Sequence, residues 1–179
     1  CIRDSGDSAD HVAFGGPIFY GHDTGSFTEE PTHPGSVFWP QAIAANKVYQ
    51  LLDRHQQAQS LVQRAPKETA ISFHGKAERP GLSVTDLTTE PKEELGKVLK
   101  LLLEPFRTSD QDEVDQCLAS QGGIDACRLV FYQQKDLGND GIWDNWRLEG
   151  PAFVWHFRGA PHVHVYVNIA DSPQVPTNA

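Results

Sequence analysis

Four strand-like stretches in succession, beginning at residue 128, constrain the fold of this chain more than any other feature. They cover residues 128–132, 145–149, 153–158 and 162–169, and Gly, Asp, Asn and Pro gather in the turns between them. Consecutive strands joined by short turns pair in the antiparallel sense. The sequence therefore predicts an antiparallel meander over its C-terminal part.

Helices are expected ahead of this meander. Apolar spacing and capping residues predict helices at 40–53, 53–62, 89–104 and from 109 onward, and strands at 11–20 and 69–73. Asp53 is the expected cap of the second helix, and Ser109 followed by Asp112 has the form of a capping box. The predicted fold class is α+β, with helices packed on one face of an antiparallel sheet.

The length and net charge of the chain limit which fold and which functions are possible. A chain of 179 residues can bury a core of its own, so we expect residues 1–179 to form a single domain. The net charge of −9 argues against sequence-independent binding to nucleic acid, which needs a basic surface, and against adhesion to anionic lipid. No apolar run approaches the roughly 20 residues of a transmembrane helix.

The cysteines bear on the compartment. Cys117 and Cys127 flank Gly122-Gly123, a turn that can bring them together. This spacing favours a disulfide, which implies a secreted, periplasmic or cell-surface protein. The alternative is a pair of buried thiols. Cys1 fits either a lipidated terminus or the point at which a longer chain was cut.

The last predicted strand carries the candidate chemistry. Side chains alternate along a strand, so His162, His164, Tyr166 and Asn168 share one face, and Val163, Val165, Val167 and Ile169 form the core face. A His-x-His pair on a rigid strand presents two imidazoles to one metal ion. The sequence thus predicts a transition-metal site for zinc, copper or iron on His162 and His164.

A third ligand depends on the register of the last hairpin. With a three-residue loop at 159–161, Arg158 pairs with His162 and His156 pairs with His164, so three imidazoles converge. With a two-residue loop, His156 turns to the opposite face. The alternative to a metal site is that these histidines are packed and hydrogen-bonded. Arg158 and Tyr166 are the residues expected to orient an anionic substrate.

A weaker candidate is a calcium loop at residues 136–144. Asp136, Asp140, Gly141 and Asp144 fall at calcium-ligating or turn positions, but Gly138 and Arg147 stand where further ligands belong. An Asx-rich turn between strands is the better interpretation, and calcium is less favoured than a transition metal.

Several stretches together are similar to the DUF3500 family, exported bacterial proteins of unknown function. They are HVAFGGPIFYGH at 11–22, FWPQA at 38–42, AANKVY at 44–49, WDNWRLEGP at 143–151 and WHFRGAPHVH at 155–164. The resemblance implies export, and it implies that this chain corresponds to the C-terminal half of a longer protein. It supplies no activity.

Two functions follow as expectations. The first is an exported metal-dependent hydrolase or oxidoreductase, in which the ion activates water or oxygen. The second is a non-enzymatic extracellular structural or assembly protein in which the histidines are structural. In both cases the expected partner is the missing N-terminal half or a neighbouring subunit, and a homo-oligomer is compatible with either function.

Overall fold

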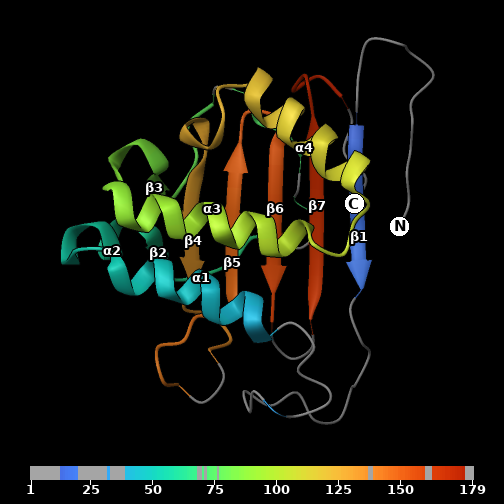
Figure 1. Ribbon diagram of the computed structural model, residues 1–179. Helices are drawn as coiled ribbons and strands as arrows, with labels where there is room; N and C mark the ends of the chain where they lie inside the picture. The colour runs from blue at the N-terminus through green and yellow to red at the C-terminus, as the bar shows by residue number, and fades with distance from the viewer. Residues whose placement is uncertain are drawn as a thin grey trace.

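The fold is the predicted α+β architecture, one mostly antiparallel sheet with helices packed on one face (Figure 1). The computed structural model describes residues 13–19, 32, 39–67, 70, 72–75, 77–136, 139–159 and 163–175, and in 13–19 it describes the backbone. In this part of the chain the helices lie in front of the sheet in Figure 1, and the strands of the C-terminal meander form its centre.

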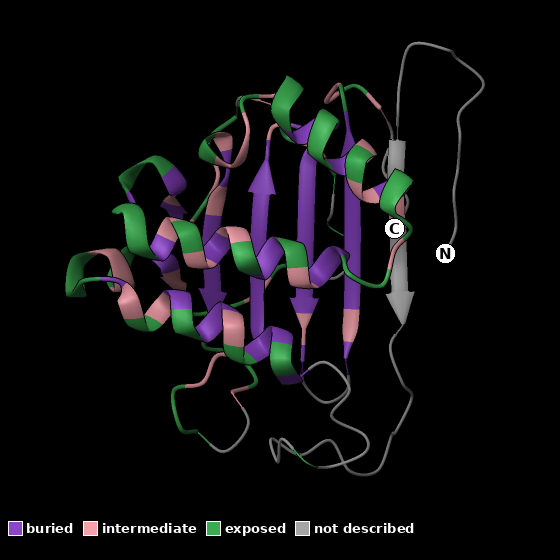
Figure 2. Ribbon diagram, viewed as in Figure 1, coloured by how far each residue is buried: buried purple, intermediate pink, exposed green. Residues whose placement is uncertain are grey.

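The helix layer consists of α1 (Trp39–Leu51), α2 (Arg54–Ser60), α3 (Thr89–Leu103) and α4 (Thr108–Ser120), with 3-10 turns η1 (Val84–Asp86) and η2 (Ile124–Ala126). Helix α3 buries Leu95, Val98, Leu99 and Leu102, the stripe that its apolar spacing predicts. Figure 2 shows exposed residues on the side of the helices away from the sheet. These apolar stripes therefore fix how the helix layer lies on the strands.

The sheet runs in the order β1-β7-β6-β5-β4-β2, and β3 pairs with β4 off this path. Its strands are β1 (Ala13–Phe19), β2 (Leu61–Val62), β3 (Leu82–Ser83), β4 (Arg128–Tyr132), β5 (Asn145–Gly150), β6 (Phe153–Arg158) and β7 (His164–Ala170). All pairs are antiparallel except β2 with β4. The predicted meander β4 to β7 is confirmed.

The core lies between the helices and one face of the meander. That face presents large apolar side chains in register across the strands: Leu129, Phe131, Trp146, Leu148, Phe153, Trp155, Phe157, Val165, Val167 and Ile169. Each is almost fully buried, and burial of one such side chain stabilises the fold by about 1.5–3 kcal/mol. Strict alternation therefore sends the intervening residues to the opposite face, where the candidate site lies.

The predicted cap of α2 is present, whereas the predicted cap of α4 is not. Asp53 caps α2 as expected, because its Oδ1 accepts from the Gln56 N–H at 2.8 Å and Gln56 Oε1 accepts from the Asp53 N–H at 3.1 Å. The predicted box at Ser109 is wrong. Helix α4 begins at Thr108, with Arg107 rather than Ser109 at the N-cap, and Arg107 makes a two-pronged ion pair with Asp110 that ties the first turn.

Two further segments differ from prediction. Leu61 and Val62 were expected at the end of a helix, but they form β2, because α2 stops at Ser60 and the chain becomes extended at Leu61. The described residues of the stretch 69–73 form no strand; they belong to the β2–β3 connection (residues 63–81), which crosses the polar face of the sheet.

The β6–β7 hairpin has a longer loop than either predicted form. Arg158 pairs with His164 and His156 pairs with Tyr166, so five residues, 159–163, connect the strands. Gly159, the first of these residues, donates its N–H to the Asp144 carbonyl at 2.7 Å, a contact that lies beyond the β6–β7 pairing. The register shifts by two residues, and His156 and His164 therefore remain on one face.

Candidate polar-face site

The face of the sheet opposite the helices is polar, yet largely buried. Its side chains form three rows across β4, β5, β6 and β7: Arg128, Glu149, Val154 and Asn168; Val130, Arg147, His156 and Tyr166; Tyr132, Asn145, Arg158 and His164. The β2–β3 connection covers part of this face, with Phe73 against Val154 and Tyr166. Burying a polar group costs free energy unless the group is hydrogen-bonded, so the contacts on this face contribute to the stability of the fold.

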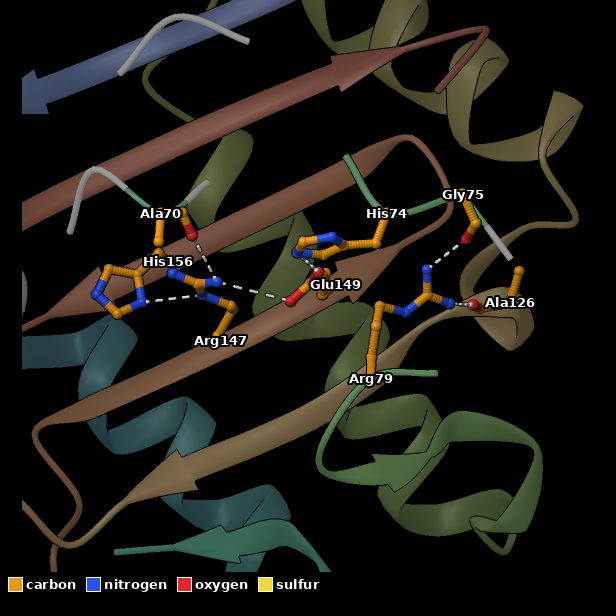
Figure 3. A network of polar contacts seen from close by, with 8 residues as sticks. All are labelled: Ala70, His74, Gly75, Arg79, Ala126, Arg147, Glu149 and His156. Atoms are coloured by element: carbon orange, nitrogen blue, oxygen red, sulfur yellow. Dashed lines mark hydrogen bonds and ion pairs between the residues drawn. The ribbon is translucent and has the colours of Figure 1, made fainter. Parts of the chain in front are cut away.

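Arg147 and His156 form the centre of the middle row (Figure 3). Arg147 Nε donates to His156 Nδ1 at 3.3 Å, and Arg147 Nη1 donates to the Ala70 carbonyl at 3.0 Å. Burial, together with the charges of Arg147 and Arg158, lowers the pKa of His156 to about 3. His156 is therefore a neutral imidazole whose Nδ1 accepts a hydrogen bond, so its proton resides on Nε2.

This arrangement does not favour His156 as a metal ligand. Its Nδ1 lone pair is used by Arg147 and its Nε2 carries the proton, while a metal needs a free ring lone pair. A cation at this position would also meet the guanidinium of Arg147 directly. The neighbourhood of His156 is better suited to an anion.

The other two predicted metal ligands are His162 and His164. His164 is half-buried at the start of β7, opposite Arg158, and His162 lies outside the described residues. Within the described residues no group of three or more His, Cys, Asp or Glu side chains is placed to hold a metal ion. The metal site on His162 and His164 stays a prediction.

Glu149 lies one row from Arg147, and Figure 3 shows it between Arg147 and His74. Its Oε2 is 3.7 Å from Arg147 Nη1, and its Oε1 is 3.4 Å from Nε2 of His74 in the β2–β3 connection. Arg79, in the same connection, donates to the carbonyls of Gly75 at 2.7 Å and Ala126 at 3.3 Å. The contact between His74 and Glu149 fastens the connection to β5, and the bond from Arg79 to Ala126 fastens it to η2.

A pocket of about 350 Å³ opens beside His156, and we call it the basic pocket. Arg158, Lys67 and Lys135 line it together with Asn145 and His156, and no Asp or Glu is among its described lining residues. His156 and Asn145 are buried, Arg158 is half-buried, and the two lysines are exposed, so the lysines lie at the mouth. Within an acidic chain this is a local concentration of positive charge.

A second pocket of about 360 Å³ adjoins the first, and we call it the mixed pocket. The two share Ala65 and Pro66 as lining residues. Both charge signs meet in the mixed pocket, which is lined by Arg64, Arg79 and Arg147 and by Glu78 and Glu149. Tyr132 also lines it, and burial raises the pKa of its phenol to about 12, so the hydroxyl stays protonated.

Of the two predicted substrate-binding residues, Arg158 lines the basic pocket and Tyr166 lines neither pocket. Tyr166 instead packs with Val154 and Phe73, with its ring tilted toward His156 at a centroid distance of 6.5 Å. Reasoning from sequence missed Arg147, Lys67 and Lys135. Alternation along 145–149 was the available signal for Arg147, since Trp146 and Leu148 point to the core and Arg147 must point away.

The two cysteines are buried free thiols in the structure, so the predicted disulfide is not present there. Cys127 packs closely under Gly150, since a Cβ built on that glycine would lie 3.0 Å from the sulfur. Burial raises the pKa of Cys127 to about 12 and that of Cys117 to about 11. Both sulfurs are thus held as protonated thiols in the core.

The acidic loop between β4 and β5 uses its carboxylates within the turn. Asp140 Oδ1 accepts from the Ile142 N–H at 2.9 Å, and Asp136 Oδ2 accepts from the Gly141 N–H at 3.4 Å. The Asp140 contact is an Asx-turn and the Asp136 contact spans the same loop, and both agree with a turn between strands. Calcium binding stays an untested prediction.

Comparisons of this chain with protein-family models, with curated proteins and with solved structures found no match. The resemblance to the DUF3500 family therefore stays a prediction that rests on the quoted stretches. Among the helices of the described part, none has both the length and the apolar character needed to span a membrane.

Proposed function

We propose that this protein binds a small anionic molecule in the basic pocket, through a phosphate, sulfate or carboxylate group. One observation carries the proposal: a pocket of about 350 Å³ in a chain of net charge −9 is lined by three cationic side chains and, among the described residues, by no carboxylate. Its volume falls within the range of small-molecule sites, roughly 300–1,000 Å³.

The residues divide the work of holding an anion. Arg158 offers a planar guanidinium that suits the oxygens of phosphate or carboxylate, while Lys67 and Lys135 at the mouth add mobile point charges that attract an anion from solution. His156 adds a neutral N–H donor, because Arg147 holds its Nδ1 as the acceptor. Charged and neutral donors thus converge on one volume.

Asn145 also supports an anion site in the basic pocket. Its Nδ2 donates to the Gln134 carbonyl at 2.8 Å, which fixes the amide, and Gln134 itself lines the pocket. The chain that carries Lys135 is therefore tied to β5 next to the lysine. A site whose donors are held before the ligand arrives loses less entropy on binding.

The test is a calorimetric titration with inorganic phosphate. We expect saturable binding to the unaltered protein, and a loss of at least about tenfold in affinity, or 1.4 kcal/mol, in the double variant Lys67→Gln/Lys135→Gln. Both lysines are exposed, so the variant should keep its fold, which circular dichroism and the melting temperature would confirm.

The matched control is Lys47→Gln/Lys100→Gln, which removes the same charge from helices α1 and α3. Its phosphate affinity should stay within about twofold of the unaltered protein, since distant exposed charges are screened at physiological salt. Absence of phosphate binding, or an equal loss in both double variants, would refute a site in the basic pocket.

A further inference from the structure

Three buried polar atoms on residues that line the mixed pocket make no hydrogen bond within the described part of the chain: Arg79 Nε, Arg147 Nη2 and Glu149 Oε1. Two of them, Arg147 Nη2 and Glu149 Oε1, are a donor and an acceptor on residues that are only 4% and 5% exposed. The Glu149 oxygen has an ion-pair neighbour in His74 at 3.4 Å, without hydrogen-bond geometry. Buried groups of this kind are usually satisfied, so both point to a partner that fills the pocket.

The chemistry of the lining narrows the partner. Three guanidinium groups disfavour an ammonium ion, and the carboxylates of Glu78 and Glu149 disfavour a second anionic group. A hydroxyl group can satisfy both Glu149 Oε1 and Arg147 Nη2, because it donates to a carboxylate oxygen and accepts from a guanidinium N–H. Val62, Pro66 and Pro80 supply apolar wall, which suits the C–H surface of a sugar ring.

From this we infer that the anion bound in the basic pocket is carried by a hydroxylated molecule, an acidic sugar or a sugar phosphate, whose hydroxyl-bearing part occupies the mixed pocket. The inference rests on the proposed function. The two pockets share Ala65 and Pro66, so one ligand can reach from the cationic lining of the first to the Arg147 and Glu149 groups of the second.

The experiment compares each compound with its parent anion by calorimetry. Glucose 6-phosphate is measured beside inorganic phosphate, glucuronate beside acetate, and glucose alone serves as the neutral probe. At least one sugar compound should bind tenfold or more tightly than its parent anion, and the pair that does so distinguishes a sugar phosphate from a sugar carboxylate. Glucose alone should bind more weakly than either.

Two variants locate the extra affinity. Glu149→Gln removes the carboxylate, and Ala70→Leu narrows the mixed pocket from the exposed β2–β3 connection. Each should lower the advantage of the sugar compound over its parent anion to threefold or less. Affinity for inorganic phosphate should stay within twofold, which also verifies that each variant is folded.

The outcomes separate this inference from the proposed function. If phosphate binds in the basic pocket but neither sugar compound exceeds its parent anion, the inference is overturned and the anion site stands. If the sugar advantage survives in both variants, the hydroxyl-bearing part does not lie in the mixed pocket and the inference is again overturned. If no anion binds, the proposed function itself fails.

Discussion

Arg147 and His156 lie directly opposite each other on β5 and β6, and the arginine Nε donates to the histidine Nδ1 at 3.3 Å on the buried polar face of the sheet. A permanently charged side chain thereby holds an imidazole in its neutral form with the proton on Nε2. A neutral imidazole beside a guanidinium is the arrangement on which the proposed anion site depends.

The first prediction concerns stability at mildly acidic pH. The pKa of His156 is lowered to about 3 in the fold, against about 6.5 in an unfolded chain, so below pH 6.5 the unfolded state takes up a proton that the folded state refuses. The stabilising effect of a neutral His156 is present above pH 6.5 and is lost as the pH falls. The free energy of unfolding should therefore fall by about 2 kcal/mol between pH 7 and pH 5.

Urea unfolding at several pH values measures this loss. The variant His156→Gln keeps a neutral acceptor for Arg147 and does not titrate, so its free energy of unfolding should fall less over the same range by about 2 kcal/mol. His55→Gln, on an exposed position of α2, should behave as the unaltered protein. Equal slopes for His156→Gln and the unaltered protein would show that His156 is accessible to protons.

The second prediction concerns the thiols. Burial raises the pKa of Cys117 to about 11 and that of Cys127 to about 12, and the thiolate is the reactive form. In a Cys1→Ser background, the folded protein at pH 8 should not react with dithionitrobenzoate over an hour. After unfolding in guanidinium without reductant, two thiols per chain should react.

The number of thiols released decides between the two interpretations of the cysteines. Two thiols agree with the structure and leave export to be tested separately. No thiol before reduction and two after it would establish the Cys117–Cys127 disulfide that the sequence predicted, and would favour an oxidising compartment.

The third prediction concerns Gly81, which leads into β3. Its φ is 97°, and a Cβ at this position would lie 2.5 Å from the Leu129 carbonyl oxygen on β4. Gly81→Ala should therefore lower the free energy of unfolding by at least about 2 kcal/mol. The loss comes from backbone strain at residue 81 and from pushing the backbone at residue 81 away from β4. Thermal or urea unfolding measures it.

Gly96 provides the matched control for this substitution. It lies within α3, and a Cβ there meets nothing within 4 Å. Gly96→Ala should stabilise the protein by about 0.5–1 kcal/mol, the usual gain of alanine over glycine in a helix. A harmless Gly81→Ala would mean that the β3–β4 edge is looser than its backbone contacts indicate.

Much of the fold followed from local pattern. The bounds of β4 and β6 agree with the strand-like stretches, because large apolar residues recur at every second position, Leu129 and Phe131 in β4 and Trp155 and Phe157 in β6. The first turn of α4 did not follow from pattern, since the Arg107–Asp110 ion pair fixes it. The length of the β6–β7 loop did not follow from pattern either, and the bond from Gly159 to Asp144 is a contact between segments that no local rule reveals.

The candidate site was predictable only in part. Alternation placed His156, Arg158 and His164 on one face, and the two-residue shift in register preserved that placement. It gave no sign of Lys67, which comes from the β2–β3 connection, or of Lys135, which comes from the β4–β5 turn. Such convergence of distant segments depends on tertiary structure, and it is the basis of the anion site that we propose.

The most direct test of the anion site is a crystal grown with tungstate, a heavy tetrahedral oxyanion that stands in for phosphate. We predict a strong anomalous peak in the basic pocket beside Arg158, and its loss in crystals of Lys67→Gln/Lys135→Gln at the same tungstate concentration. An empty pocket in the unaltered protein, with tungstate bound instead at other cationic positions of the surface, would contradict the account.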